Sequence, residues 1–145
     1  MSDNQAVLGY LGRALSFELS AVQQYLSLAA LMDVRGMKAS GDKFRQEANE
    51  EMDHVERIIA RMLALGAAPS ASQLRATHLE GDLPELMQKA KKFEQEIVSF
   101  YSQAVRHCSA NQDHDNRVFF ETILKEEQEH VEMFESWWRD TVKAS

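Results

Sequence analysis

The chain has 145 residues, of which 44% are hydrophobic and 27% charged, which is ordinary for one soluble domain that can bury a core. A net charge of −7 argues against nucleic acid as a partner and is compatible with the attraction of cations. The single cysteine, Cys108, excludes an internal disulfide and a four-cysteine metal centre.

The start of the chain has neither the basic nor the apolar region of a secretory signal. No apolar run approaches the ~18–20 residues of a membrane span. Together with a lone cysteine, which suits a reducing compartment, these features predict a cytoplasmic protein that binds no membrane.

The first half of the chain is predicted to form two long helices. Apolar residues recur at steps of three and four from about Asn4 to Val34. Residues 35–37 then form a turn, and a second helix runs from about Lys38 to Leu65. Gly66 is a good C-terminal signal for that helix.

Residues 66–82 form the one long irregular stretch, and they can connect opposite ends of a bundle. Asp82 is expected to cap a third helix, with Pro84 in its first turn and Glu85 closing a capping box. We expect that helix to continue to about Ser109.

A polar turn at residues 110–113 leads into a fourth helix, from about His114 to Val142, and no strand pattern occurs. Four long helices with one long crossover between the second and the third predict an all-α, ferritin-like four-helix bundle. We expect residues 1–145 to form this single ferritin-like domain.

One motif occurs twice in matched surroundings. Glu51 and His54 are one helical turn apart on one face, and Glu127 and His130 repeat the pattern 76 residues later. Five of the seven residues around each motif are identical. Such a coincidence indicates that the chain contains two copies of one helix pair.

A lone glutamate belongs to each copy. Glu18 and Glu94 both stand in the frame Phe-Glu-x-x-x-Val-x-x-Tyr, again 76 residues apart. Each precedes the glutamate of its own Glu-x-x-His motif by 33 residues. The two copies therefore supply four carboxylates and two imidazoles.

These six side chains are the predicted metal ligands and the predicted catalytic residues. Burying four carboxylates in one core is costly unless cations compensate them, and no basic residue occurs at the matched inward positions. Two divalent or trivalent cations would supply the missing charge, and a mixed oxygen and nitrogen ligand set suits iron or manganese. The alternative is a solvated acidic face, which we expect instead for the neighbouring Glu50, Glu56, Glu126, Glu129 and Glu132.

Tyr25 and Tyr101 each stand two turns from a predicted ligand glutamate. We expect both to support the ligands from just outside the metal shell, through a hydrogen bond to a ligand of the opposite half or by donating an electron. The alternative, a tyrosine of a bundle layer whose hydroxyl group is satisfied by a carboxylate, stays open.

Met52 lies between Glu51 and His54 but projects roughly 130° away from their midpoint on a helix. It therefore points out of the bundle, and the second copy has Gln128 there. From spacing alone, a methionine in a subunit interface is favoured.

The remaining candidates are expected to play no part in the site. His78, His107 and His114 are predicted to be surface residues, and Cys108 a small buried or half-buried side chain. Trp137 and Trp138 are adjacent, so one of them should be partly exposed or covered by another subunit.

The chain resembles a bacterioferritin over almost its whole length. The residues that carry the resemblance are in the family's order and spacing: Glu18, Tyr25, Glu51-Met52-x-His54, Gly66, Glu94 and Glu127-x-x-His130. The resemblance implies a ferroxidase that oxidises Fe(II) with O2 or peroxide at two irons per subunit, and a 24-subunit shell that stores the Fe(III) mineral.

The resemblance also assigns roles to single residues. It implies that the six matched side chains are the ferroxidase ligands, with Glu51 and Glu127 bridging. It further implies that Met52 is a haem ligand, one from each of two subunits holding a b-type haem across a twofold interface.

Three features depart from the family's pattern. The sequence is expected to lack the short fifth helix around the fourfold channels. Gln46 and Glu50 stand where some members carry His and Asp, and Met52 has the polar neighbours Asn49 and Asp53. We therefore expect a stable homodimer at least, with a 24-subunit shell held more weakly at its fourfold corners.

Two alternative functions remain open. A dimeric di-iron oxidase or peroxidase of the rubrerythrin kind would share the ligands, although such proteins usually carry an additional four-cysteine iron domain. A non-enzymatic helical bundle that binds haem or a partner would leave the six matched ligands unexplained.

Overall fold

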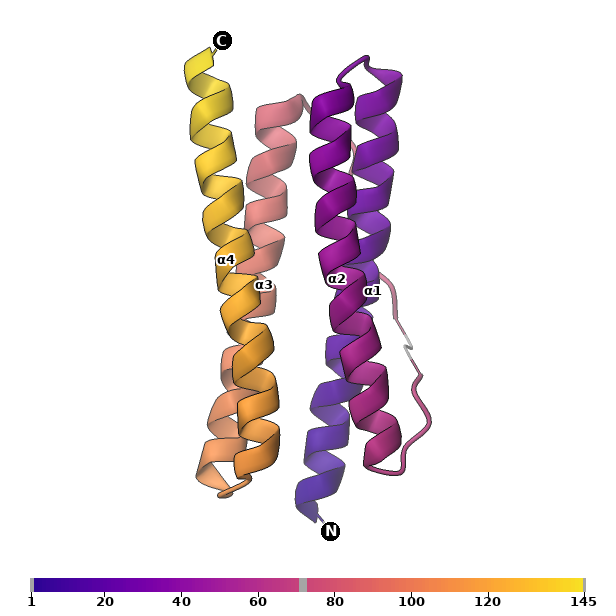
Figure 1. Ribbon diagram of the computed structural model, residues 1–145, viewed down its shortest axis with the longest axis vertical. Coiled ribbons are helices and arrows are strands. Elements are labelled where there is room, and N and C mark those ends of the chain that lie inside the picture. The colour runs from indigo at the N-terminus through magenta and orange to yellow at the C-terminus, as the bar shows by residue number, and fades with distance from the viewer. Residues whose placement is uncertain (1, 71–72, 145) are drawn as a thin grey trace. The chain divides into compact units, whose positions relative to one another are not determined.

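The computed structural model describes residues 2–70 and 73–144, which form four α-helices and no strand (Figure 1). The helices are α1 (Ser2–Val34), α2 (Lys38–Ala64), α3 (Leu83–Ala110) and α4 (His114–Ala144). The predicted helix ends are confirmed to within one or two residues. No helix of the described ranges is both long enough and apolar enough to cross a membrane.

The chain divides into two compact units, each an antiparallel pair of helices. The first hairpin comprises α1 and α2 within Met1–Leu79, and the second comprises α3 and α4 within Glu80–Ser145. In each hairpin a buried tyrosine of the first helix contacts a buried phenylalanine of the second. Tyr25 stacks on Phe44 at 6.4 Å between ring centroids, and Tyr101 contacts Phe120 at 6.3 Å. The 76-residue repeat is thus a repeat of packing as well as of sequence.

The predicted helix signals act as expected. Gly66 has φ +83°, a left-handed conformation that suits glycine, directly after the end of α2. At the start of α3, the Glu85 backbone N–H donates to Asp82 Oδ1 at 2.9 Å, and the Asp82 N–H donates to Glu85 Oε1 at 3.2 Å. This pair is the predicted capping box.

The described crossover residues, 66–70 and 73–82, form no helix or strand, and residues 75 and 78 lie against α1. Gln24 binds the backbone of His78 twice, donating from Nε2 to its carbonyl at 2.7 Å and accepting from its N–H at 2.9 Å. Further back, the Arg75 N–H donates to Ser20 Oγ at 3.0 Å, and the Arg75 guanidinium lies 5.0 Å from the ring centre of Phe17. Residue 75 contacts residue 20 and residue 78 contacts residue 24, so this part of the crossover runs parallel to α1.

Most of the single-residue predictions outside the site are confirmed. Cys108 and Trp137 are buried, and Trp138 is half-buried. His78 and His114 are exposed, as predicted. His107 is half-buried rather than on the open surface, because it lies in the last turn of α3, where the side chain of Asn111 folds back to donate to its carbonyl at 2.8 Å.

Candidate metal centre

The first hairpin brings three predicted ligands together. Glu51 and His54 are one turn apart on α2, and Glu18 faces them from α1. His54 Nδ1 lies 2.8 Å from Glu18 Oε2 and 3.3 Å from Glu51 Oε1, and all three side chains are at most 1% exposed. We call this group the first triad.

The second hairpin builds the corresponding group from α3 and α4. His130 Nδ1 lies 3.8 Å from Glu94 Oε1 and 3.5 Å from Glu127 Oε2. This second triad is looser than the first, and His130 is slightly more exposed at 6%. In each triad, the three residues can offer one ligand atom each within 4.8 Å of one another, which is close enough to share a metal ion.

The buried charge of the protein is strongly unbalanced. Among residues 4–70 and 73–144 no lysine or arginine is buried, and the only buried groups able to carry positive charge are the imidazoles of His54 and His130. Five glutamates, by contrast, are buried: Glu18, Glu47, Glu51, Glu94 and Glu127. An excess of buried carboxylates over cations is costly, and a bound divalent cation relieves it. Carboxylate and imidazole together suit iron, manganese or zinc rather than a thiolate-seeking metal.

Glu47 is the one buried carboxylate that the sequence reasoning missed. It lies one turn before Glu51 on α2 and is 5% exposed. Comparison of the two copies could not find it, because the second copy has the buried Ile123 at that position. The signal that would have found it is the four-residue spacing from Glu51, which places both carboxylates on the same helix face.

The glutamates predicted to form solvated faces lie largely as expected. Glu50, Glu56, Glu129 and Glu132 are exposed, whereas Glu126 is half-buried. Tyr25 and Tyr101, predicted to support the ligands, are fully buried in their hairpins. Burial therefore separates the six matched residues from most of their acidic neighbours.

A second feature of the first hairpin is an apolar outer face, which we define by Leu19, Leu26, Met52, Ile59 and Leu63. Leu26 is 49%, Met52 39% and Leu63 59% exposed, while Leu19 and Ile59 are half-buried. The predicted outward direction of Met52 is confirmed. These residues follow seven-residue or four-residue steps along α1 and α2, so each helix contributes one stripe.

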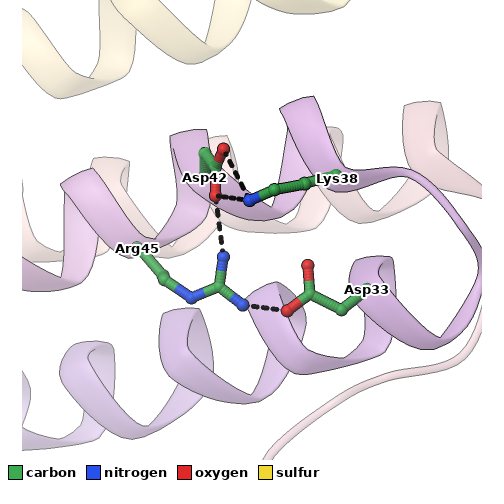
Figure 2. Close-up of polar contacts among 4 residues, drawn as sticks. All are labelled: Asp33, Lys38, Asp42 and Arg45. Atoms are coloured by element: carbon green, nitrogen blue, oxygen red, sulfur yellow. Dashed lines mark hydrogen bonds and ion pairs between the residues drawn. The ribbon is translucent and has the colours of Figure 1, made fainter.

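The two stripes adjoin across the hairpin. Asp33 continues the stripe of α1 seven residues after Leu26, and Arg45 continues that of α2 seven residues before Met52. Figure 2 shows the Arg45 guanidinium between two carboxylates, with one nitrogen on Asp33 and the other on Asp42, the latter at 2.9 Å. An ion pair from one stripe to the other requires that both lie on the same side of the hairpin.

The second hairpin provides an internal control for this surface. At the five matched positions it carries polar or charged residues: Gln95, Ser102, Gln128, Glu135 and Arg139. Its Lys91 and Glu135 form an ion pair at 2.6 Å, where the first hairpin has Leu15 and Ile59. The same fold element thus has a solvent-adapted face in one copy and an apolar face in the other.

Comparison with known proteins places the chain in a family. A model of the ferritin-like domain matches residues 8–144. Among curated proteins, the bacterioferritin of Rhodobacter capsulatus is 29% identical over 136 residues, which is 94% of this chain and 84% of that protein. The bacterioferritin of Mycolicibacterium paratuberculosis is 28% identical over the same share of this chain and 86% of its own length.

A solved structure of the R. capsulatus bacterioferritin superposes with a TM-score of 0.92 at 27% identity, covering 97% of this chain and 88% of that one. That structure is described as having a metal-free dinuclear site and haem iron in a crystallographic special position. The agreement confirms the predicted all-α, ferritin-like fold. By the extent of the match, the chain belongs to the ferritin-like family and resembles the bacterioferritins within it.

Proposed function

We propose that the two triads together bind two Fe(II) ions per chain and that the protein is a ferroxidase that feeds an iron store. The observation that carries this proposal is the set of five buried glutamates in a protein whose described part buries no lysine or arginine. The two hairpins would then act as one domain, because neither triad alone supplies six ligands.

The six ligands have distinct tasks in this proposal. His54 and His130 would each bind one iron, Glu18 and Glu94 would each bind one iron, and Glu51 and Glu127 would be shared between the two. Each Fe(II) gives up one electron, and O2 takes up both electrons with two protons to give hydrogen peroxide. Peroxide is the alternative oxidant. The carboxylates favour the product, because Fe(III) neutralises more of their charge than Fe(II) does.

Tyr25 and Tyr101 support this site in the proposal. Both are fully buried and held by aromatic contacts in matched places, so their hydroxyl groups are fixed relative to the helices that carry Glu18 and Glu94. We assign to them hydrogen bonds that orient ligand carboxylates, with electron donation as the alternative role.

Storage requires assembly, and we assign the outer face of the first hairpin to the contact with a second copy. Exposed Leu26, Met52 and Leu63 would be covered there, and the polar counterparts in the second hairpin argue that the apolar residues are selected for an interface. A homodimer is the minimum unit. A 24-subunit shell in the cytoplasm completes the proposal by likeness to bacterioferritins.

The same face fits a haem. Met52 presents a neutral thioether at 39% exposure among leucines, whereas the matched Gln128 of α4 is no such ligand. Thioethers bind haem iron, and an apolar surround suits the porphyrin. When bound, haem would supply one-electron redox chemistry, and Met52 of each copy would hold its iron at one haem per dimer.

The iron site is tested by anaerobic titration of the metal-free protein with Fe(II). Binding should saturate at two ions per chain, and admission of O2 should oxidise them in a fast phase. The double variant Glu18→Ala, Glu94→Ala should lose most of that phase while its helical circular dichroism is retained. The matched control, Glu50→Ala with Glu129→Ala, changes exposed neighbours and should keep it. Full fast oxidation in the first double variant would refute the assignment.

Assembly is tested by light scattering on a pair of matched variants. Leu26→Glu should shift the protein toward monomer, because it places a charge inside the proposed interface. Ser102→Glu introduces the same charge at the matched position of the second hairpin and should leave the dimer intact. A wild-type monomer at micromolar concentration, or equal effects of the two variants, would refute the interface.

A further inference from the structure

We propose that Arg45 binds a carboxylate of the haem that Met52 holds, and so fixes the orientation of the porphyrin on the outer face of the first hairpin. This inference rests on the haem site proposed above. It concerns a residue outside the metal ligands and outside the thioether that would bind the haem iron.

The position of Arg45 is set by helix register. It precedes Met52 by seven residues, so both project from the same stripe of α2, about 10 Å apart along the helix axis. A porphyrin carries its carboxylates on short arms at the rim, whereas its iron is at the centre. Arg45, displaced along the stripe from Met52, is therefore placed where it could pair with a carboxylate at the rim of the porphyrin.

The Arg45 guanidinium is held in place by two carboxylates but does not use all of its hydrogen-bond donors in doing so. It donates one bond to Asp33 and one to Asp42, and it has five N–H donors in a planar fork. Its side chain remains 40% exposed. Lys38 also contacts Asp42, at 3.4 Å, so two cations face two carboxylates in this cluster (Figure 2). Two carboxylates thus pre-orient Arg45 while leaving donors toward solvent.

No other cation in the described part of α2 is equally suited. Lys38 is two further turns from Met52, and Arg57 is rotated by about 140° from it and pairs with Asp53 at 3.1 Å. Asn49, Asp53 and Glu56, the polar neighbours of Met52, offer no positive charge. In the second hairpin, the position matched to Met52 carries Gln128 and the position matched to Arg45 carries Glu121. At these two matched positions, the thioether and the cation therefore occur together in the first copy, and neither occurs in the second.

The test compares two porphyrins that differ only in their carboxylates. Haemin and haemin dimethyl ester are titrated into the full-length, haem-free protein, and binding is followed by absorbance. In Arg45→Gln the affinity for haemin should fall at least about tenfold, the size expected for a charge-assisted hydrogen bond. Its affinity for the ester should be unchanged within about twofold. Arg45→Lys should recover part of the loss, and the matched control Arg57→Gln should bind both porphyrins as the wild type does.

The other possible results would overturn either the role of Arg45 or the haem site itself. Unchanged haemin binding in Arg45→Gln overturns the role of Arg45. An equal loss for haemin and ester also overturns it, because a purely structural effect of breaking the Asp33 and Asp42 contacts would affect both. If the wild type binds neither porphyrin, or Met52→Leu binds both normally, the haem site itself is wrong and the role of Arg45 falls with it.

Discussion

Glu51→Gln should make the metal-free protein more stable while removing its response to metal. Glu51 is fully buried, and its nearest cationic group, the His54 imidazole, is 3.3 Å away and closer to Glu18 at 2.8 Å. One imidazole can compensate at most one of these two carboxylates, so the group of Glu18, Glu51 and His54 carries a negative charge in excess. Glutamine keeps the shape of the side chain and removes that charge.

The magnitude follows from the cost of a buried, poorly compensated carboxylate. Relief of such a charge is worth about 1–4 kcal/mol, and about 2 kcal/mol corresponds to a Tm increase of roughly 4–8 °C for a chain of this size. The control Glu50→Gln changes the adjacent, exposed carboxylate and should alter stability by less than about 0.5 kcal/mol.

The assay is thermal unfolding followed by circular dichroism, with and without Mn(II), which resembles Fe(II) in its ligands but is not oxidised by O2. At a concentration of 100 times its Kd, Mn(II) should stabilise the wild type by about 2.7 kcal/mol and Glu51→Gln by much less. The order of the two Tm values should therefore reverse on adding metal. A metal-free Glu51→Gln that is less stable than both wild type and Glu50→Gln would refute the idea of an excess buried charge.

Three further predictions concern the hairpins themselves. Gly41→Ala should destabilise the protein by about 1–3 kcal/mol in urea unfolding. The new Cβ would lie 2.6 Å from a carboxylate oxygen and 3.0 Å from a backbone carbonyl oxygen of α1. The control Gly9→Ala, whose Cβ would meet nothing within 4 Å, should stabilise the protein by about 0.5–1 kcal/mol. Asp82→Ala removes the capping box and should cost about 1 kcal/mol, and an unchanged urea midpoint would contradict this. The hydrogen bond from Lys91 lowers the pKa of Glu135. The stability of the wild type relative to Glu135→Gln should therefore be constant at neutral pH and should shrink as the pH falls below about 4, the ordinary range of a glutamate, and through the lowered pKa of the folded state. A difference that grows in acid would reverse the assigned sign.

The helices, and the grouping of the six matched residues into two buried triads, could be predicted because they depend on local rules. Apolar steps of three and four define α1 to α4, Gly66 and Asp82 mark helix ends, and a carboxylate and an imidazole three residues apart must share a helix face. The repeat then assigns Glu18 to the first triad, because the same 33-residue separation between the lone glutamate and the Glu-x-x-His motif occurs in both copies and would rarely arise by chance.

The remaining features depend on contacts between distant segments. The path of the crossover is set by Gln24 and Ser20 on α1, and no local pattern identifies those side chains as its partners. The burial of Glu47 was missed because it breaks the repeat. His107 is half-buried at the end of α3, where the side chain of Asn111 folds back onto it, a contact that residue types alone do not reveal. Repeat matching finds what both copies share and overlooks what one copy has gained.

The difference between the outer faces of the two hairpins has a consequence for how growth of an assembly stops. If a protein were built from two identical hairpins, each apolar face would occur twice, and every molecule could recruit another on both faces in an open-ended polymer. In this chain the leucines and Met52 occur on one hairpin, whereas their matched positions on the other carry glutamine, serine, glutamate and arginine. If the proposed dimer forms through this face, a chain with one such face would close as a twofold pair instead of propagating.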